Sequence, residues 1–202
     1  MAITPEEVAE TLSMVSQQNL DLRTITMGVS LFGCADEDMG RMCTKVYDRI
    51  TKTAERLVPT AEQLEREYGI PIANKRVSVT PIAQIAAACD DEDLTPIAQA
   101  MNRAAEALGI DFMGGFSALV QKGMGSADRR LIASIPSAVA STERICSSLN
   151  IASTRAGINM DAALLSAQTM IDCAKATTDI DCYGAAKFVV FANMVEDSPF
   201  MA

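Results

Sequence analysis

The stretch Met27–Asp38, MGVSLFGCADED, places apolar residues and glycines directly before a thiol and three carboxylates. Such an apolar run is typical of a buried strand, and carboxylates are favourable at a helix start because they oppose the positive end of the helix dipole. We therefore expect a strand over Arg23–Phe32 and then a long helix capped by Asp36 or Asp38. A strand that leads directly into a helix is the repeating unit of an α/β protein.

The same unit recurs along the chain. Further strands are predicted over 76–80, 110–116, 144–153 and 186–194, and helices are predicted to start at Thr4, Thr80, Thr95, Ser126, Pro136 and Asn159. Several strands look apolar on both faces, which is typical of parallel strands covered by helices on two sides. The pattern predicts five mostly parallel strands with helical crossovers in one α/β domain over residues 1–202. In the last helix, one apolar face is formed by Met160, Leu164, Ala167, Ile171 and Ala174.

Composition restricts the possible functions. The net charge of −9 argues against a nucleic-acid groove, which needs clustered Lys and Arg. The longest apolar run is far shorter than the ~20 residues that a spanning helix needs, and the acidic start has no signal-peptide layout, so we expect a cytoplasmic protein. Its six cysteines form no C-x-x-C pair and are expected to be reduced. Because histidine is absent, acid–base chemistry would fall to carboxylates, thiols, lysines or tyrosines.

Three stretches resemble one family. They are Asn19–Gly28 (NLDLRTITMG), Asp111–Leu119 (DFMGGFSAL) and Ser153–Ala162 (STRAGINMDA). They resemble the DUF711 (UPF0210) family of uncharacterised bacterial and archaeal proteins, often labelled "PFL family protein", and the resemblance runs through essentially the whole chain. It implies a fold like one five-stranded half of the ten-stranded barrel of pyruvate formate-lyase. It also implies that this chain is the N-terminal half of a longer architecture, and that the protein forms homodimers.

The implied fold does not by itself imply radical chemistry. Glycyl radical enzymes need a glycine loop of the form R-V-[SA]-G-aromatic. The segment Arg76-Val77-Ser78-Val79-Thr80 begins in that way but has Val79 where the radical glycine must be. The glycyl radical motif is therefore absent from this chain, and whether the protein is an enzyme is left open.

The first candidate site follows the first strand. Gly33-Cys34-Ala35-Asp36 is similar to the Gly-Cys-x-Glu motif of some glycyl radical enzymes, with Asp in place of Glu. In addition, the N-terminus of the helix that follows would lower the pKa of the Cys34 thiol. We therefore name Cys34 and Asp36 as candidate catalytic residues. The alternative is structural, because the acids at this position also act as a helix cap and would oppose a thiolate.

The second candidate group consists of ligand-binding residues expected at strand ends, where parallel α/β folds place their sites. Glycines allow a ligand to approach the backbone, although they also make simple turns. An Arg beside a helix start suits an anion, although the same polar residues also make caps. The candidates are Gly114, Gly115, Ser117, Arg155, Asn159 and Asp161. The acidic run Asp90–Asp93 is more typical of a solvated loop than of a metal site, and we predict no metal site.

The sequence is compatible with two functions. The first is binding of a small polar or anionic metabolite at the carboxyl ends of the strands. If the protein is an enzyme, we expect carboxylates and thiols to act as acid and base, and Arg155 to hold an anionic substrate. The second is a structural or regulatory protein that forms a homo-oligomer or docks onto a second half-barrel, because open edges of a sheet invite association. The sequence assigns no cofactor.

Overall fold

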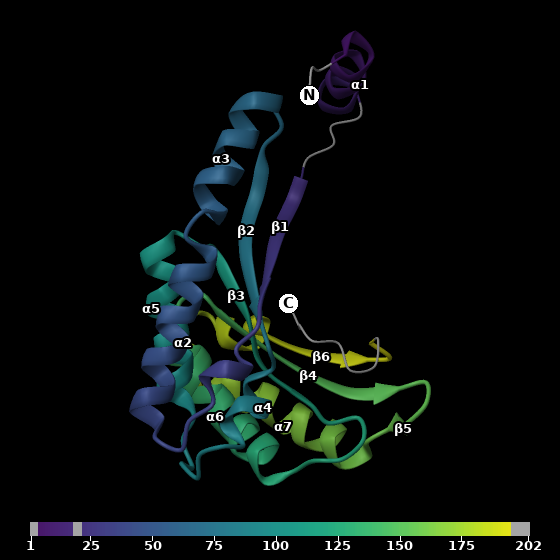
Figure 1. The fold of residues 1–202 in the computed structure, drawn as a ribbon. Coiled ribbons are helices and arrows are strands. Elements are labelled where there is room, and N and C mark those ends of the chain that lie inside the picture. The colour runs from purple at the N-terminus through teal and green to yellow at the C-terminus, as the bar shows by residue number, and fades with distance from the viewer. Residues whose placement is uncertain (1–3, 18–21, 195–202) are drawn as a thin grey trace.

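The computed structural model describes residues 4–17 and 22–194 (Figure 1). The helices are α1 (Pro5–Ser16), α2 (Met39–Ala54), α3 (Leu57–Tyr68), α4 (Ile82–Ala86), α5 (Thr95–Leu108), α6 (Ser126–Ser141) and α7 (Met160–Ala176), with 3₁₀ turns η1 (Phe32–Cys34), η2 (Thr178–Ile180) and η3 (Tyr183–Lys187). The strands are β1 (Leu22–Val29), β2 (Ile72–Val79), β3 (Phe112–Leu119), β4 (Ile145–Ser153), β5 (Gly157–Ile158) and β6 (Phe188–Ala192).

The strands form one sheet in which β1, β2, β3, β4 and β6 lie side by side, in the order of the chain, and each pair is parallel. The short β5 adds an antiparallel pair at the end of β4. This arrangement confirms the predicted α/β class and its parallel sheet with helical crossovers. Parallel connections are almost always right-handed, so a chain that advances in one direction across the sheet places its crossover helices on the same face.

The hydrophobic core lies on this helix-covered face. Along β2, β3 and β4, the core side chains include Val77, Met113, Ile145 and Leu149, which alternate with residues of the other face. Helices α2 to α7 pack onto this side of the sheet (Figure 1). The expectation of strands apolar on both faces is therefore wrong for much of the sheet. Because a strand has a period of two, the residues between the core positions form a second face of different character.

We call this second face the polar face. By register it holds Thr24, Thr26 and Gly28 of β1, Asn74, Arg76 and Ser78 of β2, Phe112, Gly114, Ser117 and Leu119 of β3, Cys146, Ser148 and Asn150 of β4, and Val189 and Phe191 of β6. Most of these side chains are polar or small. None of them belongs to the core cluster of the described residues.

Several predicted boundaries differ from the observed ones. The first strand ends at Val29, and Phe32 begins η1 instead of ending the strand. Pro136 lies inside α6 and does not start a helical turn of its own, because buried residues on both sides of it, such as Leu131 and Val139, hold the helix against the sheet. The end predicted for the first helix, near Gln18 and Asn19, lies outside the described residues.

The apolar face of α7 points outward, although an apolar helix face usually marks the core side. Met160 is 69% exposed, Leu164 is 77% exposed and Ile171 is 50% exposed. The buried positions of this helix are instead Ala162, Ser166, Thr169 and Cys173. Small and weakly polar residues fill that interface because α7 packs closely against α6 and β4.

Candidate functional site

The segment after β1 holds Cys34 and Asp36 in a network of its own. Cys34 is buried, its Sγ donates to the carbonyl oxygen of Lys45 at 3.5 Å, and burial raises its thiol pKa although Arg49 and Lys45 oppose this. Asp36 accepts hydrogen bonds of 2.7 Å from both Arg41 Nη2 and Lys45 Nζ. These bonds, of which the one from Arg41 has the largest effect, hold the carboxyl pKa of Asp36 well below its usual range.

These properties define the chemistry available at this segment. At neutral pH the raised pKa of Cys34 favours a neutral thiol, and Asp36 is an ionised carboxylate paired with two cations. The helix cap itself is Asp38, whose Oδ1 accepts from Arg41 N at 2.8 Å. This geometry fits a structural role for Cys34 and Asp36, and their catalytic role stays a prediction.

The glycine pair of β3 occupies a different place from the predicted one. Gly114 and Gly115 were expected at a strand end, but β3 continues to Leu119, so that both lie inside the strand. The register with β4 shifts between Met113 and Phe116, which makes a β-bulge. Gly115 has φ +112°, and a Cβ there would overlap Val79 Cγ2 and lie 2.7 Å from the carbonyl oxygen of Val79, so glycine is required by the close approach of β2. Ser117 is buried, and its Oγ donates to the carbonyl oxygen of Gly115 at 3.2 Å.

The turn between β4 and α7 holds the other predicted ligand-binding residues. Arg155 and Asp161 are exposed, and Asp161 lies in the first turn of α7. Asn159 is the helix cap, since its Oδ1 accepts from Ala162 N at 3.1 Å while its Nδ2 donates to the carbonyl oxygen of Val120 at 2.7 Å. The turn is thereby fixed to the carboxyl end of β3.

One polar atom at this end of the sheet has no partner among the described residues. Gln121 lies two residues after Leu119, the last residue of β3, and is 5% exposed, and its Oε1 is buried without a hydrogen bond to the described residues. Sequence reasoning missed this residue, although a glutamine within two residues of the end of an apolar strand is a usable signal. A buried acceptor of this kind favours a donor group that is not part of the described chain.

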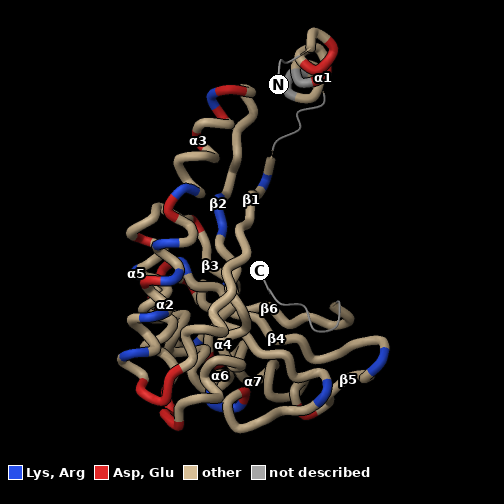
Figure 2. Tube along the Cα trace, in the orientation of Figure 1, with Lys and Arg blue, Asp and Glu red and all other residues tan. Residues whose placement is uncertain are grey.

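The distribution of charged residues differs between the sheet and the helical side. Figure 2 shows acidic positions gathered around α2 and the loops near it, and few charged positions along the strands. The described strands contain three basic residues, Arg23, Lys75 and Arg76, and no acidic ones. Of these, Arg76 lies on the polar face, and Lys75 Nζ pairs with Glu65 of α3 at 3.2 Å. The acidic net charge of the protein therefore does not extend to its sheet.

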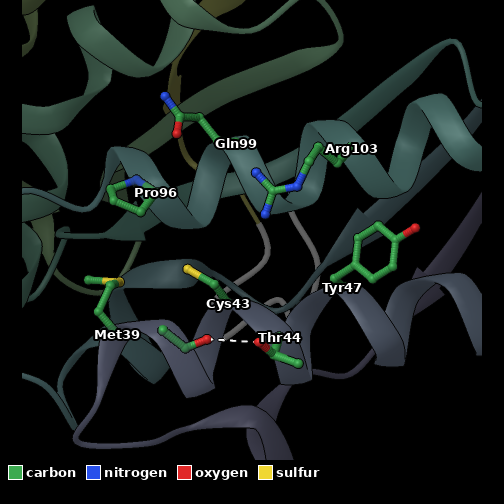
Figure 3. A pocket seen from close by; sticks show the side chains of 8 residues that line it. Met39, Cys43, Thr44, Tyr47, Pro96, Gln99 and Arg103 are labelled. Atoms are coloured by element: carbon green, nitrogen blue, oxygen red, sulfur yellow. Dashed lines mark hydrogen bonds between the residues drawn. The ribbon is translucent and has the colours of Figure 1, made fainter.

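A groove lies between α2 and α5, on the helical side (Figure 3). Its volume is about 540 Å³, and its lining includes Cys43 and Tyr47 of α2 and Gln99 and Arg103 of α5. Burial raises the pKa of the Cys43 thiol, and the Arg103 guanidinium acts in the opposite direction. None of the described residues that line this groove belongs to the predicted strand-end site.

Three further properties concern the described residues as a whole. No group of three or more Cys, Asp or Glu side chains within them is arranged to hold a metal ion. Also within them, no helix combines the length and apolar character needed to cross a bilayer. All six cysteines are free thiols.

Comparison with known proteins gives consistent matches. Residues 13–202 match the family model described as "Uncharacterised ACR (DUF711)". The chain is 55% identical over 97% of its length to a UPF0210 protein of Desulforamulus reducens and 54% identical over its whole length to one of Pelobacter propionicus. A UPF0210 protein of Syntrophotalea carbinolica is also 54% identical over the whole chain. The matches cover 43%, 44% and 45% of these three relatives, so the chain spans less than half of their length.

Proposed function

We propose that this chain, which belongs to the DUF711 (UPF0210) family of uncharacterised proteins, binds a small polar or anionic metabolite at the carboxyl ends of its parallel strands. The observation that carries the proposal is the Oε1 of Gln121 just beyond the end of β3, which is buried and has no partner among the described residues. Leaving such an acceptor unpaired costs about 1–3 kcal/mol, and a ligand hydroxyl or amine would remove that cost.

Neighbouring groups support the same location. The Arg155 side chain supplies a positive charge in the turn that Asn159 fixes beside β3, and a guanidinium suits a carboxylate or phosphate. The backbone bond from Val120 N to the carbonyl oxygen of Asn150 ties the ends of β3 and β4 together at 2.9 Å. Open α/β sheets bind their ligands at this end of the strands. We propose no glycyl radical chemistry, and we place the protein in the cytoplasm, where free thiols such as these six persist.

The test is native mass spectrometry of the purified chain, followed by a thermal-shift screen of small metabolites. A compound that stabilises the chain is then measured against Gln121→Leu, Arg155→Ala and Cys34→Ser, with Arg56→Ala, at the exposed residue before α3, as the matched control for a lost surface charge. We expect Gln121→Leu and Arg155→Ala each to weaken binding by about tenfold, which corresponds to the loss of one good polar contact. Unchanged binding in both variants would show that the strand-end assignment is wrong.

The second candidate function is assembly, favoured by the exposed apolar face of α7. Met160, Leu164 and Ile171 present neighbouring apolar side chains on the outside of the helix, and contiguous exposed apolar surface commonly marks an interface. We propose that this face docks onto a second copy of the chain or onto a second half-barrel in a longer protein. Leu164→Lys should then abolish a dimer seen by light scattering, whereas Leu64→Lys, at an exposed leucine of α3, should not. A monomer at high concentration would argue against the second copy.

A further inference from the structure

The polar face of the sheet places two polar side chains, Ser78 and Cys146, on either side of a glycine. Ser78 pairs in register with Gly114, and Cys146 follows Ile145, which pairs with Met113. Ser78, Gly114 and Cys146 therefore stand at the same level on three neighbouring strands. Two strand spacings separate Ser78 from Cys146 by about 10 Å at their Cα atoms, and the residue between them has no side chain. This spacing is suited to a group of a few atoms.

Ser78 is one of the buried polar residues whose hydrogen bonds are incomplete. It is 1% exposed, and its Oγ has no hydrogen-bond partner among the described residues. The serine hydroxyl both donates and accepts, so it normally finds a partner when it is buried. The strand itself does not need this hydroxyl, because an alanine would satisfy the same packing.

Arg76 lies two residues earlier on the same strand and therefore on the same face. Its guanidinium carbon lies 5.4 Å from the centroid of the Phe112 ring, and its buried Nε also has no partner among the described residues. The ring holds the side chain along the sheet, which reduces the entropy that it loses when it binds an anion. The two unpartnered groups, one N–H and one O–H, are both donors.

The positive charge of Arg76 acts on the thiol of Cys146. Burial raises the pKa of its thiol, while the charges of Lys187 and Arg76 act in the opposite direction. Lys187 itself is buried, and its Nζ donates to the carbonyl oxygens of Val139 and Thr142, so its donors are directed to the end of α6. Arg76 is therefore the cation whose hydrogen-bonding capacity remains available beside the thiol.

We propose that Arg76 and Ser78 form a binding site for a small carboxylate on the polar face, directly beside the thiol of Cys146. A guanidinium and a hydroxyl together match the two oxygens of one carboxylate, and one cation balances one negative charge. The described strands contribute no acidic residue that would repel the ligand. Phe112 offers an apolar surface to the rest of a small organic acid. This site is separate from the strand-end site around Gln121 and does not depend on it.

Two alkylating reagents that differ in charge test the proposal. Iodoacetate carries a carboxylate, whereas iodoacetamide is neutral and of nearly the same size. The rate of modification at each cysteine of the folded 202-residue chain is measured by peptide mass spectrometry at one pH and low salt. We expect the iodoacetate-to-iodoacetamide rate ratio at Cys146 to exceed that at the exposed Cys182 by at least about fivefold, because a nearby cation attracts the charged reagent.

Variants of the donors separate binding from general charge effects. Arg76→Gln should bring the Cys146 ratio down to that of Cys182, while Arg103→Gln, beside Cys43, should leave it unchanged. Ser78→Ala removes an unpartnered hydroxyl and should not lower the melting temperature, but it should weaken the protection of Cys146 that millimolar acetate gives against iodoacetamide. This variant keeps the test valid if Arg76→Gln does not fold.

Several outcomes would overturn the proposal. One is a Cys146 ratio that equals that of Cys182 in the unmodified chain. Another is a raised ratio that survives Arg76→Gln in a folded protein, which would assign the effect to Lys187. Resistance of Cys146 to both reagents would show that the face is closed to solutes of this size and would also refute the site. Failure of the Gln121 and Arg155 variants to affect metabolite binding would leave this result untouched.

Discussion

Asn159 Nδ2 donates a hydrogen bond of 2.7 Å to the carbonyl oxygen of Val120, and this bond ties the start of α7 to the end of β3. The same side chain caps the helix through its Oδ1 and Ala162 N. One amide thus fixes both the first turn of a helix and the position of that helix against the sheet. The turn that contains Arg155 lies between these two anchoring points and the end of β4.

Replacement of Asn159 separates its two roles. Asn159→Ala should lower the free energy of unfolding by about 2 kcal/mol, because it removes a cap and a bond between elements. Asn159→Ser keeps a capping oxygen but cannot reach Val120, so we expect a loss of about 1 kcal/mol. Urea unfolding followed by circular dichroism gives both values. Equal losses in the two variants would contradict the contribution of the Val120 bond.

Gly115 is predicted to be the least replaceable glycine of the sheet. Gly115→Ala should lower the free energy of unfolding by about 3 kcal/mol or more, since the new methyl group would overlap Val79 at a positive φ. Gly109→Ala is the matched control, because Gly109 also has a positive φ, of 69°, but nothing lies within 4 Å of its Cβ position. There we expect about 1 kcal/mol from the backbone conformation alone. A comparable loss in both variants, measured by urea unfolding, would refute the role of the Val79 contact.

The thiol of Cys173 should make stability depend on pH in the alkaline range. Burial, with a smaller effect of the Asp172 charge, raises its pKa from 9.0 to about 11. Between these values the unfolded chain releases a proton that the folded chain keeps, so the free energy of unfolding falls as pH rises. Cys173→Ala should make this decline shallower in urea unfolding curves measured across that range. Thr169→Ala, also buried in α7 but not titratable, should shift all values by a similar amount; an unchanged slope in Cys173→Ala would contradict the prediction.

Lys187 is predicted to stabilise the fold through its hydrogen bonds to the end of α6. Lys187→Met keeps the volume but removes the donor to the carbonyl oxygens of Val139 and Thr142, and we expect the free energy of unfolding to fall by about 2 kcal/mol. Lys175→Met, at an exposed position of α7, should change it by less than about 0.5 kcal/mol. If the two variants have equal stability in chemical denaturation, the buried bonds of Lys187 do not stabilise the fold.

Local signals in the sequence predicted the structure well. Thr4 and Glu7 form the capping box that their spacing indicates, and Asn159 caps α7 as predicted. In each case a side chain bonds to a backbone group within three residues, so that the relevant partner is visible in the sequence. The parallel α/β class could be predicted for the same reason, since each strand and helix has its own periodic pattern.

Features that depend on distant strands were not predictable in this way. The position of Gly114 and Gly115 inside β3 depends on the bulge opposite β4 and on the approach of Val79 from β2. The outward direction of the apolar face of α7 depends on which side of that helix meets α6 and β4. One overlooked signal was local: in β2 the polar Asn74, Arg76 and Ser78 alternate with the core residues Val77 and Val79. This alternation indicates a sheet with one polar face, and it could have identified Arg76 and Ser78 as candidates.

The order of the strands has a consequence for how the protein is made. Each of β2, β3 and β4 pairs with the strand that precedes it in the chain, and β6 pairs with β4. A chain that leaves the ribosome from its N-terminus can therefore add one strand at a time to an existing edge, without waiting for a distant partner. Each addition closes only the loop of the intervening crossover, which keeps the entropic cost of each step small. The sheet can thus grow in the same direction as synthesis.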